Sequence, residues 1–187
     1  ILLGMGMPTS AIYLLLATMI APSLIKLGVN QIAAHMFVLY FGLMSMITPP
    51  VAIAAFAAAT LAGSKPLETG MTAVRLGWIA YIIPFVFVLS PSLLMQGGTV
   101  EVAVSFITAV IGVWIASCGF IGYLYRPIGP AIRVAFVASG LALLLPGGAV
   151  PHGITLNIVG AVLAVVLVGR EYMARRSDRG STQAAST

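Results

Sequence analysis

Charged residues are scarce in this chain. Its 187 residues include nine Lys and Arg and four Asp and Glu, or 7%, against about 25% in an ordinary soluble domain. None of them falls within residues 27–64 or 134–169. Uncharged apolar runs beyond about 18 residues are typical of membrane spans. This composition excludes a soluble globular enzyme, a disordered chain and a nucleic-acid-binding module. It predicts an all-α polytopic membrane protein whose solvent is the lipid bilayer.

Cysteine and catalytic motifs are equally sparse. Cys118 is the single cysteine, so no disulfide can form within the chain, and its apolar surroundings predict an inert buried thiol. The sequence holds no Ser–His–Asp constellation, no HExxH or CxxC motif and no phosphate-binding loop. We therefore expect no enzyme activity and no organic cofactor. We expect His35 to make a structural hydrogen bond, with a proton-carrying role as the alternative.

Glycine, proline and polar residues divide the chain into apolar segments. The pattern predicts a helix over 9–28, a long interrupted segment over 31–63, and spans over 72–95, 100–124, 131–146 and 153–169. A polar tail follows at 170–187. Ile1 already lies in an apolar run, so we expect the chain to be a C-terminal piece of a longer protein.

The basic residues predict the orientation, because cytoplasmic loops carry an excess of Lys and Arg. Placing the basic tail in the cytoplasm leaves only Lys26 outside. It gives a cytoplasmic C-terminus, cytoplasmic loops at 64–71 and 126–133, and outer segments at 28–35, 96–101 and 147–153. The aromatic residues expected to anchor at the membrane interfaces are Trp78, Tyr81, Trp114, Tyr123 and Tyr125.

The long segment 31–63 exceeds one straight span and is interrupted in its middle by Thr48-Pro49-Pro50. The two prolines lack the N–H groups that would bond to the carbonyls of Ser45 and Met46. Pro50 is suited to begin a second helix. We expect two half-helices joined by an unwound stretch near the bilayer centre. Its carbonyls must meet protein, water or a cation, because they cannot face lipid unpaired.

The start of the chain has a second break. Pro8 lacks the donor for the carbonyl of Gly4, and Thr9 or Ser10 is expected to cap a helix from Ala11 onward. Paired breaks of this kind form sodium sites in transporters, with half-helix N-termini facing an anionic substrate. A simple proline kink is the alternative. The alanine-rich half-helix after Pro50 is expected to pack against other protein, since small residues permit close approach.

Four stretches in this order resemble a known family: GMGMPTSAIYLLLA, IKLGV, FGLMSMITPPVAIAAFAAA and RLGWIAYIIPF. Together they resemble the large membrane subunit of TRAP (tripartite ATP-independent periplasmic) transporters, over about residues 1–96. The alanine-rich form of these stretches is most similar to the fused permeases that work with TAXI-type binding proteins. The resemblance implies an elevator-type transporter in a bacterial or archaeal inner membrane. It implies sodium-driven uptake of an organic-acid-like solute, received from a periplasmic binding protein.

The resemblance also implies roles for residues. The stretch 1–28 matches the tip and return arm of a re-entrant hairpin, and 31–63 the broken helix beside it. Sodium would lie between the hairpin glycine, here Gly4, and a Gly-x-x-Thr-Pro-Pro stretch, which has Ser45 at its first position and Thr48 at its threonine. The family often has glycine at Ala52 and an acid at Pro8. The candidate cation ligands, mostly backbone carbonyls, are Gly4, Gly6, Ser45, Met46, Thr48 and Val51. The residues expected near the substrate are Pro8, Thr9, Ser10, Pro49 and Pro50.

The resemblance implies that residues 1–96 are the C-terminal part of the transport region. Beyond it, the apolar pattern predicts additional membrane helices over 97–169, and the charges predict a cytoplasmic polar tail over 170–187. A small membrane subunit is expected to be fused N-terminally, and no nucleic acid partner is expected. Two alternatives remain: a structural or assembly subunit without a site of its own, and an intramembrane enzyme whose catalytic residues lie in a missing N-terminal part.

Overall fold

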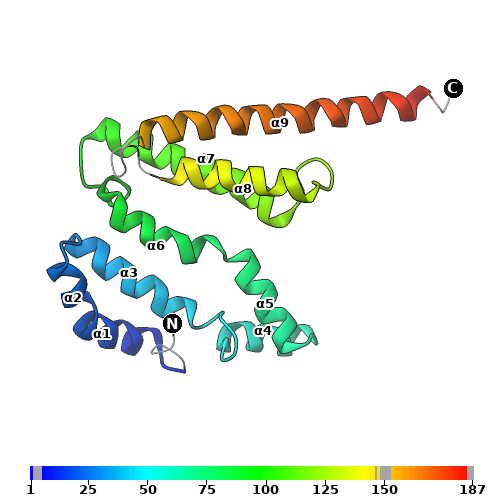
Figure 1. Ribbon diagram of the computed structural model, residues 1–187. Helices are drawn as coiled ribbons and strands as arrows, with labels where there is room; N and C mark the ends of the chain where they lie inside the picture. Colours follow the sequence, from blue (N-terminus) through cyan, green and yellow to red (C-terminus); the bar gives the residue numbers. More distant parts are fainter. Residues whose placement is uncertain (2–5, 146, 148–152, 185–187) are drawn as a thin grey trace. The chain divides into compact units, whose positions relative to one another are not determined.

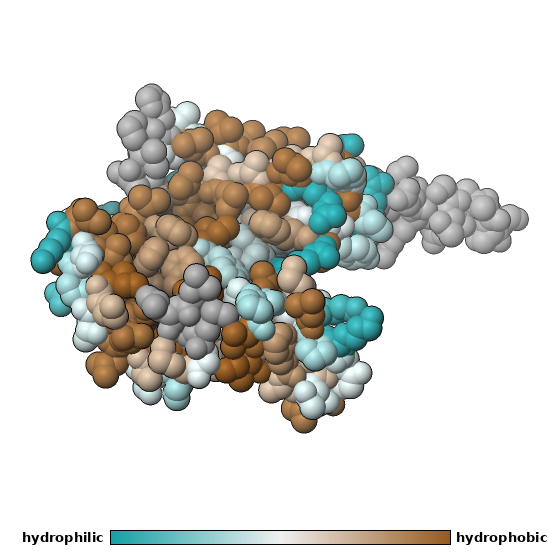
Figure 2. Space-filling model, turned by 60° about the horizontal axis from the view of Figure 1, so that its bottom comes forward, coloured by the Kyte–Doolittle hydropathy of each residue, from teal (hydrophilic) through white to brown (hydrophobic). Residues whose placement is uncertain are grey.

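The computed structural model describes residues 1, 6–145, 147 and 153–184, with side chains as far as Ala174. Every regular element in these ranges is a helix (Figure 1), which confirms the all-α prediction. The chain divides into two compact units, Ile1–Gly97 and Gly98–Thr187. The segments long and apolar enough to cross a membrane are Thr9–Lys26, Pro66–Leu89, Thr99–Ile121 and Gly153–Ala174. Figure 2 shows hydrophobic side chains over much of the visible surface, as lipid exposure requires.

The first unit begins with three helices: α1 (Thr9–Met19), α2 (Ala21–Lys26) and α3 (Gln31–Met44). The predicted helix 9–28 is therefore divided at Ile20, because Pro22 lacks the N–H that would continue it. Helices α1, α2 and α3 pack together through buried Ile12, Leu16, Ala21, Ala34 and Val38. The contact is close, since a Cβ added at Gly42 would lie 2.6 Å from Cγ2 of Ile12. The first turn of α1 thus lies beside the last turn of α3.

The predicted interruption of the long segment is present. Helix α3 ends at Met44 and helix α4 spans Ile53–Ala62, with turns between them. The expectation that Pro50 begins the second helix is wrong, because α4 starts three residues later. Ala52, at its N-cap, is held in the left-handed conformation with φ of 35°. A residue in that conformation cannot belong to the helix, so the unwound stretch extends over 45–52.

Helices α5 (Pro66–Leu76) and α6 (Ile79–Leu89) follow, with the 3-10 helix η2 (Pro91–Leu94). The predicted loop 64–71 is shorter than expected. A proline at the first helical position and Glu68 in the first turn both favour a start at Pro66. Rings hold α6 against α3: Phe85 packs on Phe37 and Phe41, at centroid distances of 5.2 and 5.5 Å, and Phe87 packs on Tyr40 at 5.7 Å.

The second unit contains α7 (Thr99–Ile121), α8 (Pro130–Leu144) and α9 (Gly153–Ala184). Small residues let α7 and α8 approach closely: a Cβ at Gly140 would lie 2.5 Å from the carbonyl oxygen of Gly112 and from the amide nitrogen of Ala116. The hydroxyl of Ser139 donates to the carbonyl of Gly160 at 2.8 Å and joins α8 to α9. Cys118 is buried in this unit, as predicted.

The polar tail is not the wholly solvated end that its charges suggest. Helix α9 continues from the predicted span through the tail as far as Ala184. Glu171 is only 1% exposed, and its Oε2 lies 2.7 Å from Nε of Arg126, in the α7–α8 connection. The ion pair compensates part of the cost of burying the carboxylate, whose other oxygen, Oε1, has no hydrogen-bond partner among the described residues.

Candidate functional site

The end of α3 tightens before the chain unwinds. The N–H groups of Ser45, Met46 and Ile47 bond to carbonyls three residues earlier, at 3.2, 3.0 and 3.2 Å. The N–H of Thr48 bonds to the carbonyl of Met44 at 3.0 Å. Pro49 and its successor cannot donate, so the helical ladder stops there. The break has the local cause that the sequence indicates.

The carbonyls of the unwound stretch are partly satisfied by the helix that follows. The carbonyl of Met46 accepts the N–H of Ala54 at 3.0 Å, and the carbonyl of Thr48 accepts the N–H of Ala52 at 3.1 Å. The Met46 carbonyl, which Pro50 deprives of its helical donor, thus meets protein through Ala54, one of the three partners expected for it. A carbonyl oxygen has two lone pairs, so this one retains a lone pair for a second partner.

The hydroxyl groups at the break turn back toward α3. Ser45 is buried, and its Oγ donates to the carbonyl of Gly42 at 2.6 Å. Thr48 Oγ1 donates to the carbonyl of Met44 and also lies 2.7 Å from the hydroxyl of Tyr81 on α6. The sequence suggested an interfacial anchor at Tyr81 and missed this contact with the break.

One face of the α5–α6 segment packs along the unwound stretch. A Cβ at Gly70 would lie 3.0 Å from Cγ of Pro49, and a Cβ at Gly77 would lie 3.1 Å from Cδ1 of Ile47. Gly70 lies in α5, Gly77 caps its end and Tyr81 lies in the first turn of α6, so three successive parts of this segment face the unwound stretch. The unwound backbone meets protein here, as a membrane environment requires.

The first break takes a different form from the one expected. Gly6 has φ of 83°, and α1 begins at Thr9 with Pro8 as its N-cap and no side-chain cap. Capping by Thr9 or Ser10 is therefore wrong: the helix starts two residues before Ala11, so both hydroxyl-bearing residues lie in its first turn and are exposed. Gly4 lies outside the described residues. The α1–α3 contact nevertheless brings the two breaks to the same end of this helix pair.

Packing of α4 is one-sided. Ala52, Ala55 and Ala59 are buried, and Gly70 lies against Ala52, but Leu61 is 91% exposed. The expectation that the whole half-helix packs against protein is thus met on one face only within the described residues.

Oxygen atoms dominate the polar groups of the candidate site. Within the described ranges, no cluster of three or more His, Cys, Asp or Glu is placed to hold a metal ion. The groups at the break are carbonyls and hydroxyls, which suit a hard cation. His35 makes the structural hydrogen bond expected of it, with the hydroxyl of Tyr13 at 3.0 Å from Nδ1.

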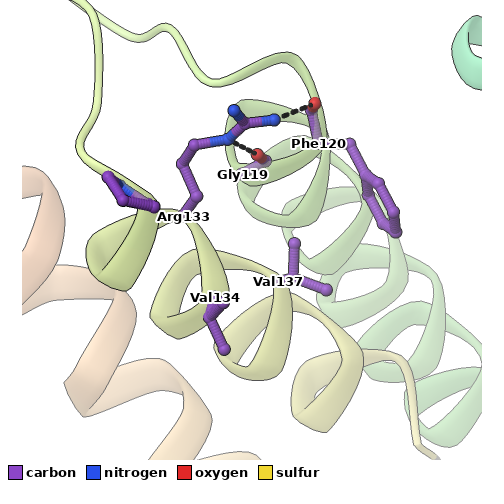
Figure 3. Close-up of a pocket in the computed structure, with 6 residues that line it drawn as sticks. Gly119, Phe120, Arg133, Val134 and Val137 are labelled. Carbon is purple, nitrogen blue, oxygen red and sulfur yellow. Dashed lines mark hydrogen bonds between the residues drawn. The ribbon is translucent and has the colours of Figure 1, made fainter.

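The second unit has an open pocket of about 320 Å³ (Figure 3). Arg133 crosses it and donates from Nε and Nη2 to the carbonyls of Gly119 and Phe120, at 3.1 and 3.0 Å. Those carbonyls end α7, so Arg133 acts as a cap for that helix. The remaining lining is apolar, from Pro130, Val134 and Val137.

Comparison with protein-family models gives one assignment. The model described as "Tripartite ATP-independent periplasmic transporter, DctM component" matches residues 1–102. The chain belongs to this family. This TRAP component is thus a membrane protein of a secondary transporter family, not of an enzyme family. Components of this kind work with a periplasmic binding protein and a small membrane subunit. No curated protein and no solved structure matches the chain.

Proposed function

We propose that this TRAP component couples the uptake of an organic-acid-like solute to sodium entry. The observation that carries the proposal is the unwound stretch 45–52, which is packed against α5 and α6 and offers a threonine hydroxyl and backbone carbonyls. Transporters bind sodium with such unwound carbonyls. The proposed ligands are Gly4, Gly6, Ser45, Met46, Thr48 and Val51.

The solute is proposed to bind at the same end of the α1–α3 pair. The N-terminus of α1 carries a partial positive charge, and Thr9 and Ser10 lie exposed in its first turn. A carboxylate is the group that such a helix end attracts. Pro8, Pro49 and Pro50 are proposed to border the solute.

The proposed setting is a bacterial or archaeal inner membrane, with the C-terminus in the cytoplasm. A TAXI-type binding protein delivers the solute, a small membrane subunit is fused N-terminally, and transport follows an elevator mechanism. The α1–α2 segment serves as the arm of a re-entrant hairpin. The start of α1 and the α3–α4 break move together in this scheme, because α1 packs closely on α3 at Gly42.

The test is uptake into proteoliposomes that contain the assembled transporter and its binding protein. The proposal expects uptake of a radiolabelled organic acid to require an inward sodium gradient. It also expects uptake to stop when sodium is replaced by choline or when an ionophore abolishes the gradient. Uptake that is equal in sodium and in choline, with the same membrane potential, would contradict sodium coupling.

A further inference from the structure

The hydrogen bond between Thr48 and Tyr81 has a defined direction. A threonine hydroxyl has one proton, and the carbonyl of Met44 can only accept, so the proton of Thr48 points to Met44. Tyr81 must then donate its own proton to Thr48 Oγ1, across the 2.7 Å between their oxygens. One lone pair of Thr48 Oγ1 is left, and its direction is set by the two hydrogen bonds.

We propose that Tyr81 is a positioning residue for the cation site, which orients the last lone pair of Thr48 toward the ion. The inference rests on the proposed sodium coupling and adds to it a residue from another helix. Tyr81 does not touch the ion in this scheme. It acts through the Thr48 hydroxyl: its proton occupies the lone pair on the α6 side and leaves the other lone pair for the ion.

The surroundings of Tyr81 make it a rigid support. Phe85 lies one helical turn further along α6 and packs on Phe37 and Phe41 of α3. On the other side, the backbone at Gly77 touches Ile47 of the unwound stretch. The Tyr81 hydroxyl is thus held relative to α3 by contacts on both sides along α6.

The experiment compares Tyr81→Phe with Tyr40→Phe in the assembled transporter. Both changes remove one hydroxyl from a ring at the α3–α6 interface, and the ring of Tyr40 packs on Phe87. We expect Tyr81→Phe to raise the half-saturating sodium concentration roughly fivefold, the factor that corresponds to the loss of one ordinary hydrogen bond. The KM for solute at saturating sodium stays the same. We expect Tyr40→Phe to leave both values unchanged.

A double-mutant cycle tests whether Tyr81 acts through Thr48. Thr48→Val removes the hydroxyl that Tyr81 is proposed to position. Adding Tyr81→Phe to Thr48→Val is therefore expected to raise the half-saturating sodium concentration no further. If the two effects multiply, or if Tyr81→Phe behaves as Tyr40→Phe does, the positioning role is overturned. Parent uptake that needs no sodium would instead refute the proposed coupling itself. Thermal unfolding in detergent without sodium shows whether a variant has lost its fold. If Tyr81→Phe alone is unfolded, the comparison of Thr48→Val with the double variant decides whether Tyr81 has a positioning role.

Discussion

Asn30 and Gln96, 66 residues apart in the sequence, share a hydrogen bond of 2.7 Å from Nδ2 to Oε1. Asn30 also accepts the N–H groups of Ile32 and Ala33, so it caps α3 while it holds the segment after η2. The bond places the start of α3 and the end of the first unit together. Both segments were assigned to the outer side from the basic residues alone, and their contact requires that they share a side.

That arrangement predicts the labelling of introduced cysteines. In a Cys118→Ser background, a cysteine replacing exposed Thr99 is expected to react with an impermeant maleimide added to intact cells. A cysteine replacing exposed Ser64, between α4 and α5, is expected to react only after the membrane is opened. Reaction of the residue 64 cysteine in intact cells would show that the orientation is opposite to the one expected.

Loss of the Thr48 hydroxyl is expected to weaken sodium coupling more than stability. Thr48→Ala removes the bonds to Met44 and Tyr81 but leaves both prolines and the break. We expect the half-saturating sodium concentration to rise about tenfold, by analogy with the loss of one or two hydrogen bonds. The measurement is uptake against sodium concentration.

The matched control for this change is Thr60→Ala. Thr60 bonds to the carbonyl of Phe56 on the exposed face of α4 by the same back-bonding geometry. Thr60→Ala is expected to leave the half-saturating sodium concentration at the parent value. Unchanged sodium dependence in Thr48→Ala, together with lower expression, would assign Thr48 a purely structural role.

Restoring the missing donors is expected to damage transport without loss of stability. Pro49→Ala with Pro50→Ala supplies an N–H for the carbonyl of Ser45 and a competitor to Ala54 for the carbonyl of Met46. Helix propensity favours a continuous helix by about 3 kcal/mol for each proline replaced in a helix interior. Uptake and thermal stability, each with and without sodium, check the outcome. A double variant that gains as much stability from sodium as the parent would show that these carbonyls are not ligands.

The close α7–α8 contact predicts that adding one methyl group at Gly140 will greatly lower stability. A Cβ at Gly140 meets the backbone of α7 at 2.5 Å, which cannot yield as a flexible side chain would. We expect Gly140→Ala to cost about 2 kcal/mol or more, as overpacking does. Gly169→Ala on α9 is the control, since its Cβ meets nothing within 4 Å, and it is expected to be neutral or slightly stabilising. Thermal unfolding in detergent measures both; equal midpoints would refute the close contact.

Features with a local cause were predictable from the sequence. The break at Thr48-Pro49-Pro50 follows from the absence of two N–H groups, whatever surrounds it. The start of α4 was not predictable in the same way, because it depends on the left-handed conformation of Ala52 beside Gly70. Glycine, which the resemblance implies at this position in many relatives, adopts this conformation without the strain that Ala52 bears.

Contacts between distant residues were the other part that the sequence did not reveal. Tyr81 reads as an interfacial aromatic until α6 is placed against Thr48, 33 residues away. Glu171 reads as one charge in a solvated tail until its partner Arg126, 45 residues earlier, is known. In both cases composition gives the typical environment of a residue type, and only tertiary packing gives the exception.

The ion pair between Arg126 and Glu171 makes the α7–α8 connection and the base of the tail one mechanical piece. Rotating α9 about its axis, or drawing it along the membrane normal, would pull Arg126 with it or strand a carboxylate among apolar side chains. The base of the tail and the loop after α7 are therefore expected to move together.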